Sequence, residues 1–288
     1  MLSKLIKYDF RALSRVLWPT MAAVAGASLI AALSFRFSER TYADSASGLV
    51  TVLSGILALI MVLAIIAACL LVVFLICAHF YRNLMTDEGY LTFTLPVKTS
   101  EILWSKLITA MFWTLISTVV VSLCVLMFAG VSALGSKNGM QILSDLADGI
   151  RQLFGAFGAK SALLTVEFIL LALAGMAYSI LHIYLALVIG GVVSHKHKIL
   201  AGIGFYFVIS IIVSVITSIA QYYFGGSLIA GMSTFGSVWR IQSDVEMANS
   251  LVRAAQPYYW FNLVFLLAMD TACFLLSKYF LEKKLNLE

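Results

Sequence analysis

The sequence predicts an all-α membrane protein with six transmembrane helices, because six runs of the chain are long, apolar and nearly free of charge. These runs are Leu17–Phe35, Ala46–Ala78, Leu107–Ser136, Ser161–Ser194, Ile199–Trp239 and Ala254–Ser277. An α-helix rises about 1.5 Å per residue and needs roughly 20 apolar residues to cross a hydrocarbon core about 30 Å thick. Each run is long enough. We expect the spans at residues 17–36, 49–79, 104–133, 161–193, 199–222 and 257–278.

The composition supports the same fold class. Hydrophobic residues make up 62% of the 288 residues and charged residues make up 11%, with a mean hydropathy of +1.00. A soluble protein of this length cannot bury that much apolar surface. We therefore expect a single transmembrane domain over residues 1–288. The four cysteines all lie in apolar runs, which favours buried thiols over disulfides or metal ligands.

Lysine and arginine are distributed unevenly between the two sides of the membrane, and this predicts the orientation. With the N-terminus in the cytoplasm, twelve of the nineteen basic residues fall on inner segments and seven fall on outer ones. Membrane proteins carry such an excess on the cytoplasmic side. The short loop Ser194–Lys198 is the clearest inner marker. We expect both termini in the cytoplasm and a first span that is retained rather than cleaved as a signal peptide.

Three helices are predicted outside the spans. Residues 1–16 separate apolar from basic side chains as an interfacial amphipathic helix does, although a basic flank that anchors the first span is the alternative. Residues 141–157 place their apolar side chains on one helical stripe. Ser243–Glu246 is a capping box that predicts a helix from Asp244. We place the last two helices on the outer face, and we expect the glycine-rich residues 225–236 to re-enter the membrane.

The segment between the second and third spans, Phe80–Glu101, mixes charged residues with Tyr, Leu and Phe. A loop that contacts only water needs no such side chains, whereas a surface that binds another protein does. We predict that residues 82–91 form a short helix or turn that binds a protein partner in the cytoplasm.

Three ionisable side chains fall inside the predicted spans. Glu167 lies near the outer end of the fourth span, His182 lies in its inner half, and Asp270 lies at a similar depth in the sixth. A charge in the membrane is unfavourable unless it is paired or hydrated. These residues either line a transport path or make polar contacts between helices. We also hypothesise that His182 and Asp270 come within one side chain's reach of each other.

The sequence holds no motif for chemistry of its own. Gly130–Lys137 has a serine where a nucleotide-binding loop requires its lysine. There is no His-Glu-x-x-His zinc motif, no Cys-x-x-Cys pair and no Gly-x-Ser-x-Gly elbow. We expect no catalytic residue, no cofactor and no metal site in this chain. The net charge of +5 is explained by basic inner loops, so we expect no nucleic-acid partner.

Two stretches resemble the type-2 ABC transporter permeases of Gram-positive bacteria. They are Asp87–Val97 followed by Lys98–Lys106, and the opening Met1–Arg11. The order of the predicted elements also resembles that family. The resemblance implies a bacterial cytoplasmic membrane protein whose segment after the second span is a coupling helix that docks on a separate ATPase subunit. It implies an exporter of two permease domains and two ATPases, with ATP and Mg²⁺ bound by the ATPases.

By the same resemblance, seven residues contact the ATPase: Arg82, Asn83, Leu84, Asp87, Glu88, Tyr90 and Leu91. We expect the charged members to orient the partner, and Leu84, Tyr90 and Leu91 to be buried in the contact. The other expected partners are membrane lipids and a second permease, either another copy or a homologue. The resemblance suggests outward movement of an amphipathic substrate, such as an antimicrobial peptide or a lipid-like molecule.

Two other classes of function stay open. A stand-alone secondary transporter driven by protons would use Asp270 or Glu167 as the carrier, and a membrane-embedded enzyme is disfavoured by the missing motifs. A soluble ATPase that co-purifies would favour the permease subunit. Transport by the lone chain under a pH gradient would favour the secondary transporter. The sequence leaves open the substrate, the pairing of permeases and the role of residues 141–157.

Overall fold

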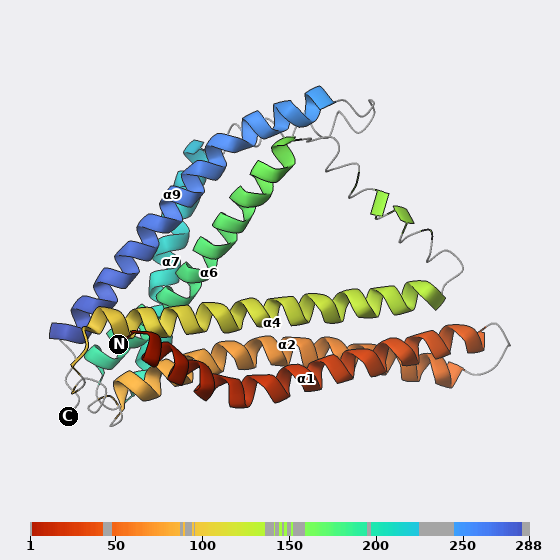
Figure 1. Cartoon of the computed structure of the whole chain (residues 1–288), viewed down its shortest axis with the longest axis horizontal. Coiled ribbons are helices and arrows are strands. Elements are labelled where there is room, and N and C mark those ends of the chain that lie inside the picture. The colour runs from red at the N-terminus through yellow and green to blue at the C-terminus, as the bar shows by residue number, and fades with distance from the viewer. Residues whose placement is uncertain are drawn as a thin grey trace. The chain divides into compact units, whose positions relative to one another are not determined.

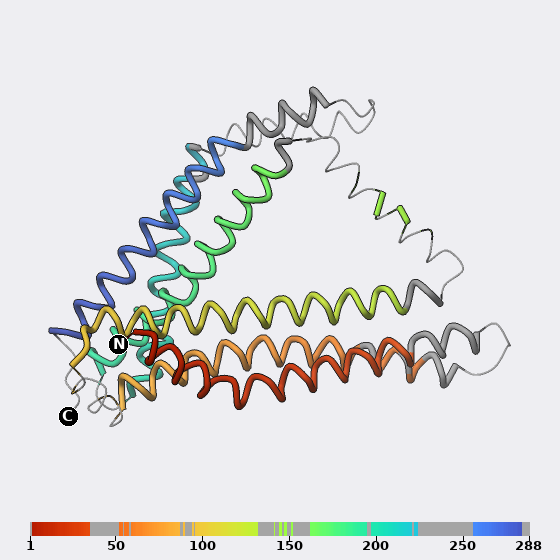
Figure 2. Tube along the Cα trace, viewed as in Figure 1, coloured from red at the N-terminus to blue at the C-terminus, as the bar shows by residue number. Residues whose placement is uncertain are grey.

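The computed structural model describes residues 2–42, 48–86, 89, 94, 96–135, 141, 144–145, 147–148, 151, 159–194, 197–224 and 245–283. Six long helices contain nearly all of them (Figures 1 and 2): α1 Leu2–Tyr42, α2 Gly48–Met85, α4 Thr99–Gly135, α6 Ala159–Val193, α7 Lys198–Phe224 and α9 Val245–Lys283. None of these described residues lies in a β-strand. The all-α prediction is therefore confirmed for this part of the chain.

Each of the six helices is long and apolar enough to cross a membrane. The shortest, α7, has 27 residues, and the longest, α1, has 41, whereas a bilayer requires roughly 20. Main-chain amide and carbonyl groups find no water in a hydrocarbon core, so a continuous helix, which bonds them internally, is the stable form of such a sequence. Each predicted span lies almost wholly within one of these helices.

Helix α1 lacks the break that we predicted between residues 1–16 and 17–36. Pro19 stands near the predicted start of the first span, but the helix continues through Pro19 to Tyr42. An internal proline removes one main-chain hydrogen bond and bends a helix that its other bonds maintain. Figure 1 shows α1 bent in its N-terminal part. The predicted interfacial segment is thus the first part of a longer helix.

Helix α9 also extends beyond its predicted span. The capping box at Ser243–Glu246 predicts a helix from Asp244, and α9 begins one residue later, at Val245. The helix then continues through Pro257 to Lys283. The predicted outer helix and the sixth span are one element, because a single proline does not outweigh the internal bonds of so long a helix.

Some predicted elements lie outside the described residues. These are the re-entrant stretch 225–236 and most of the helix predicted at 141–157, of which only Gln141, Ser144–Asp145, Ala147–Asp148 and Arg151 are described, as helical.

By its packing, the chain divides into two compact units. The first unit contains residues 1–80 and 104–150, which include α1 and most of α2 and α4. The second unit contains residues 81–103 and 151–288, which include α6, α7 and α9. The segment that joins α2 to α4 therefore belongs to the second unit, whereas the bodies of both helices belong to the first.

In the first unit, α1, α2 and α4 lie alongside one another (Figure 1). Val24, Ala68 and Cys124, one from each helix, form a buried apolar cluster. Nearer the start of α1, Phe10 stacks on Trp113 of α4 with the ring centroids 5.0 Å apart. The side chain of Trp113 is fully buried. These contacts hold α1 against its neighbours at two levels.

In the second unit, α6 packs against both α7 and α9, which scarcely contact each other. The Ser194 N–H donates to the Gly190 carbonyl at 3.1 Å, and the His197 N–H donates to the Ser194 hydroxyl at 3.2 Å. The two helices form a hairpin whose backbones come very close at Gly190 and Gly202.

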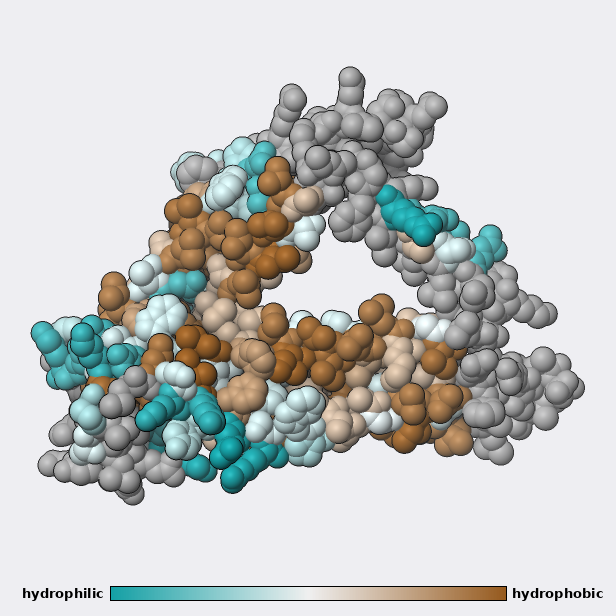
Figure 3. Space-filling model, in the orientation of Figure 1, coloured by the Kyte–Doolittle hydropathy of each residue, from teal (hydrophilic) through white to brown (hydrophobic). Residues whose placement is uncertain are grey.

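Large apolar side chains remain exposed along the helices. Leu126 of α4 is 66% exposed, Ile211 of α7 is 63% exposed and Val264 of α9 is 63% exposed. In Figure 3 hydrophobic residues cover much of the length of the helices, and hydrophilic residues gather toward helix ends. An apolar girdle of this kind suits helices that face lipid, where burying such side chains inside the protein is unnecessary.

Candidate functional sites

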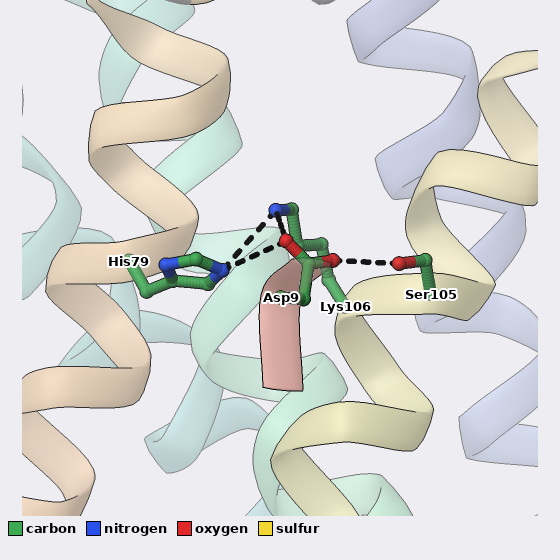
Figure 4. Close-up of polar contacts among 4 residues, drawn as sticks. All are labelled: Asp9, His79, Ser105 and Lys106. Carbon is green, nitrogen blue, oxygen red and sulfur yellow. Dashed lines mark hydrogen bonds and ion pairs between the residues drawn. The ribbon is translucent and has the colours of Figure 1, made fainter. Parts of the chain in front are cut away.

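A polar cluster joins the three helices of the first unit. It consists of Asp9 of α1, His79 of α2, and Ser105 and Lys106 of α4. The side chains of the last three residues contact the Asp9 carboxylate (Figure 4). Lys106 Nζ donates to Asp9 Oδ1 at 2.5 Å, and the Ser105 hydroxyl donates to Asp9 Oδ2 at 2.6 Å. His79 Nε2 lies 3.0 Å from Asp9 Oδ1. Both carboxylate oxygens are thus engaged, and the charges of Asp9 and Lys106 offset each other.

The imidazole of His79 has two possible partners. Its Nε2 lies 3.0 Å from Asp9 Oδ1 and 3.2 Å from Lys106 Nζ. A ring nitrogen with a proton donates and one without a proton accepts. His79 therefore donates to the carboxylate in one tautomer and accepts from the ammonium in the other. Either way it remains inside the cluster.

The cluster is buried. Asp9 is 7% exposed and Lys106 is 6% exposed, and His79 is nearly as enclosed. Taking charges out of water is unfavourable unless the pair is close and its remaining bonding capacity is filled. The short contacts of Asp9 meet both conditions. Such an arrangement fixes the relative positions of three helix segments, because charge-assisted hydrogen bonds are directional.

Our sequence reasoning missed this cluster, although a signal was present. Leu2, Ile6, Asp9, Leu13 and Leu17 recur at helical spacing, so an acidic residue occupies the apolar stripe of α1. An acid on an apolar face implies a cationic partner elsewhere in the chain. Lys106 lies within our predicted third span, 104–133, and is the one basic residue in that span.

The second unit contains the predicted intramembrane residue His182, on α6. Its side chain is buried, and each ring nitrogen has a partner. Nδ1 lies 2.9 Å from the Tyr178 hydroxyl, while Nε2 lies 3.3 Å from the Ser210 hydroxyl and 3.4 Å from the Tyr206 carbonyl of α7. With the proton on Nε2, His182 donates to α7 and accepts from Tyr178. This is a polar contact between α6 and α7.

No hydrogen bond links His182 to Asp270 among the described residues. Asp270 lies on α9, and its Oδ1 is buried without a hydrogen-bond partner there. His182 bonds instead to the Tyr178 hydroxyl, one helical turn earlier on α6. A close approach of His182 and Asp270 stays a prediction. Glu167, also on α6, is half-buried, within electrostatic range of Tyr259.

Of the residues that we expected to contact an ATPase, Arg82, Asn83 and Leu84 lie in the last turn of α2, whereas Asp87, Glu88, Tyr90 and Leu91 lie outside the described residues. Leu84 is fully buried. Its side chain therefore contributes to the interior of this chain, and we no longer expect it to be part of a contact surface. The neighbouring residues Met85, Ile102 and Leu103 are buried as well.

In the part of the chain that the structure describes, no group of three His, Cys, Asp or Glu side chains is placed so that it could bind a metal ion. The cysteines at 69, 77, 124 and 273 are free thiols. Comparison with family models, with curated proteins and with solved structures finds no match to this chain.

Replacing Tyr178 by phenylalanine is expected to destabilise the protein by about 0.5–1.5 kcal/mol, because His182 Nδ1 loses its buried partner. Thermal unfolding in detergent measures the effect. In a double-mutant cycle, Tyr178→Phe and His182→Ala should couple by more than ~0.5 kcal/mol. His182→Ala and Asp270→Asn should be nearly additive. The matched control is Tyr222→Phe, whose ring is 81% exposed and whose change should be near neutral. Strong His182–Asp270 coupling would contradict this geometry.

Proposed function

We propose that the chain is the membrane-spanning permease subunit of an ATP-driven exporter, powered by a separate ATPase subunit. The resemblance of Asp87–Lys106 and Met1–Arg11 to type-2 ABC permeases supports this function, as do the six helices able to cross a membrane. The chain itself carries out no chemistry in this account. ATP and Mg²⁺ are bound by the partner, and this subunit converts the partner's motion into movement of its helices.

The observation that carries the proposal is the place of the segment between α2 and α4. Residues 81–103 belong to the unit of α6, α7 and α9, while the helices on both sides of the segment belong to the other unit. A partner that binds this segment therefore acts on the second unit, with which the segment packs. It also acts on the first unit, because the segment is covalently continuous with α2 and α4. A position of this kind suits a coupling element between an ATPase and two groups of helices.

Two contacts of the segment 81–103 are described. Lys198 Nζ at the start of α7 donates to the Met85 carbonyl at 3.5 Å. The Gly89 N–H donates to the Thr86 carbonyl at 2.7 Å. A Cβ atom on Gly89 would lie 2.7 Å from the Leu84 carbonyl oxygen, so only glycine fits at this position.

In the proposed assembly two permeases and two ATPases act together, and both termini of this chain and the segment 81–103 face the cytoplasm of a bacterium. The inner excess of basic residues supports that orientation. The proposed cargo is an amphipathic molecule, such as an antimicrobial peptide or a lipid-like compound. The exposed apolar faces of the helices are compatible with such a substrate and with a second permease.

The double substitution Glu88→Ala with Tyr90→Ala is expected to release the ATPase while the chain still inserts into the membrane. An aromatic residue at the centre of an interface typically contributes about 2 kcal/mol or more, which is roughly a 30-fold loss of affinity. A pull-down with the tagged full-length chain measures the loss. Glu282→Ala with Tyr279→Ala is the matched control, since both residues are exposed at the end of α9. Unchanged co-purification of the ATPase with the first variant would reject the proposed contact.

A second candidate function is a stand-alone transporter driven by protons. The observation in its favour is the Asp270 carboxylate, which lies within a helix able to span the membrane and whose Oδ1 has no hydrogen-bond partner among the described residues. A carboxylate in that position can carry a proton. The two candidates differ in their source of energy, so they are distinguished by experiment.

A further inference from the structure

The polar cluster around Asp9 lies next to the two points where the chain passes from one compact unit to the other. The chain leaves the first unit between Phe80 and Tyr81 and returns between Leu103 and Trp104. His79 comes just before the first point, and Ser105 and Lys106 come just after the second. Asp9 contributes a third, distant part of the sequence, the N-terminal part of α1.

The carboxylate of Asp9 bonds to both of these crossing points at once. Its Oδ1 contacts His79 on α2 and Lys106 on α4, and its Oδ2 accepts from Ser105 on α4 (Figure 4). A single side chain therefore bonds to α2 and to α4 close to where they leave the first unit. The same side chain attaches α1 to both of them.

Apolar packing alone does not provide an equally specific attachment. Val24, Ala68 and Cys124 hold the three helices together farther along, but lipid chains are as apolar as these side chains, so no hydrophobic force opposes sliding in a membrane. A charge-assisted network with short bonds has one favourable geometry. Asp9 therefore adds a directional attachment of α1 to α2 and α4 beside the stack of Phe10 on Trp113.

We infer that Asp9 is the positioning residue that makes α1 follow the movement of the segment 81–103. The inference rests on the proposed function, because the source of that movement is the ATPase bound to the segment. When the partner shifts the segment, α2 and α4 move at His79 and Lys106, and the Asp9 carboxylate carries α1 with them. Without the carboxylate, α2 and α4 still move and α1 does not.

Distances between spin labels test the inference in the full-length chain, reconstituted in lipid nanodiscs with its co-purified ATPase. The native cysteines are first replaced. One label pair joins Ile30 of α1 to Leu126 of α4, and the reference pair joins Leu59 of α2 to Leu126, all three being exposed positions. In the parent protein, ATP with Mg²⁺ should change the Leu59–Leu126 distance and leave the Ile30–Leu126 distance nearly constant, because Asp9 makes α1 follow α4.

In Asp9→Asn, the Ile30–Leu126 distances without nucleotide should spread at least twofold more widely, and ATP with Mg²⁺ should now change them, because α4 moves and α1 does not follow. The Leu59–Leu126 pair should behave as in the parent. Exchanging the charges, with Asp9→Lys and Lys106→Asp together, should restore most of the narrow distribution. Glu282→Gln, which removes a carboxylate from an exposed pair with Lys278, should leave both pairs unchanged.

The distances measured without nucleotide test the role of Asp9 independently of the proposed function. An unaltered Ile30–Leu126 distribution in folded Asp9→Asn protein overturns the inference. Equal broadening of both pairs also overturns it, because the substitution would then loosen the whole unit. Absence of an ATPase and of any response to ATP in the parent protein overturns the proposed function instead.

Discussion

Replacing Lys106 by methionine is expected to destabilise the folded chain by about 3–5 kcal/mol, because the substitution leaves the Asp9 carboxylate buried without its cation. The methionine side chain fills a similar volume, so the loss reports the charge and its hydrogen bonds rather than a cavity. The midpoint of thermal unfolding in detergent or nanodiscs measures it. This substitution has the largest effect that we expect from a single side chain.

Two further variants separate this explanation from a general sensitivity to mutation. Lys278→Met removes a lysine that lies 4.0 Å from Glu282 and is 38% exposed, so its effect should be within about 0–1 kcal/mol. Asp9→Leu combined with Lys106→Met removes both charges and should be less destabilising than Lys106→Met alone. If the double variant is less stable than Lys106→Met, the unpaired Asp9 charge is not the cause of the destabilisation.

The second large effect is expected at Gly190, where α6 meets α7. A Cβ atom there would lie 2.3 Å from the Gly202 nitrogen and 2.5 Å from the Gly202 Cα. Main-chain atoms cannot rotate away as side chains do, so Gly190→Ala must push the two helices apart. We expect a loss of about 2–3 kcal/mol and lower yields of folded protein in the membrane.

Neighbouring glycines provide a graded series. At Gly202 the nearest atom to a new Cβ is Leu187 Cδ2 at 3.2 Å, and at Gly204 nothing lies within 4 Å. Gly202→Ala should therefore be milder than Gly190→Ala, since a leucine methyl group can shift. Gly204→Ala should be neutral or stabilising by up to about 1 kcal/mol, because alanine favours a helix. Equal effects at all three positions would contradict the close helix contact.

Charge-poor runs were sufficient to predict the six helices, because each is far longer than a bilayer requires and lipid leaves the main chain no other means of satisfying its hydrogen bonds. The boundaries were less predictable. Pro19 and Pro257 stand at or near the predicted starts of the first and sixth spans, yet both lie inside longer helices, α1 and α9. Proline disfavours a helix locally, but the long apolar sequence maintains it. The capping box predicts a helix from Asp244, and the described part of α9 begins at Val245.

The polar contacts depend on three-dimensional packing, which periodicity along one helix does not encode. Asp9 lies about 100 residues from Lys106 in the chain and is in contact with it. His182 and Asp270 were both recognised as unusual in a span. The partners of His182, however, are Tyr178 on its own helix and Ser210 and Tyr206 on α7, and none of these residues raises a comparable signal in a sequence. In the sequence, Gly190 likewise could not be distinguished from glycines such as Gly204, where a Cβ atom would contact nothing within 4 Å.

Energy transfer between two fluorescent dyes shows whether an ATPase drives movement of the helices. The dyes are placed on Leu126 of α4 and Leu163 of α6, exposed positions in different units, and the labelled chain is reconstituted in proteoliposomes with or without the ATPase that co-purifies with it. The account predicts that transfer changes when ATP and Mg²⁺ are supplied, that the change requires the ATPase, and that a pH gradient has no effect on the chain alone. A response of the lone chain to a pH gradient, abolished by Asp270→Asn and indifferent to ATP, would contradict the permease account and favour the proton-driven transporter.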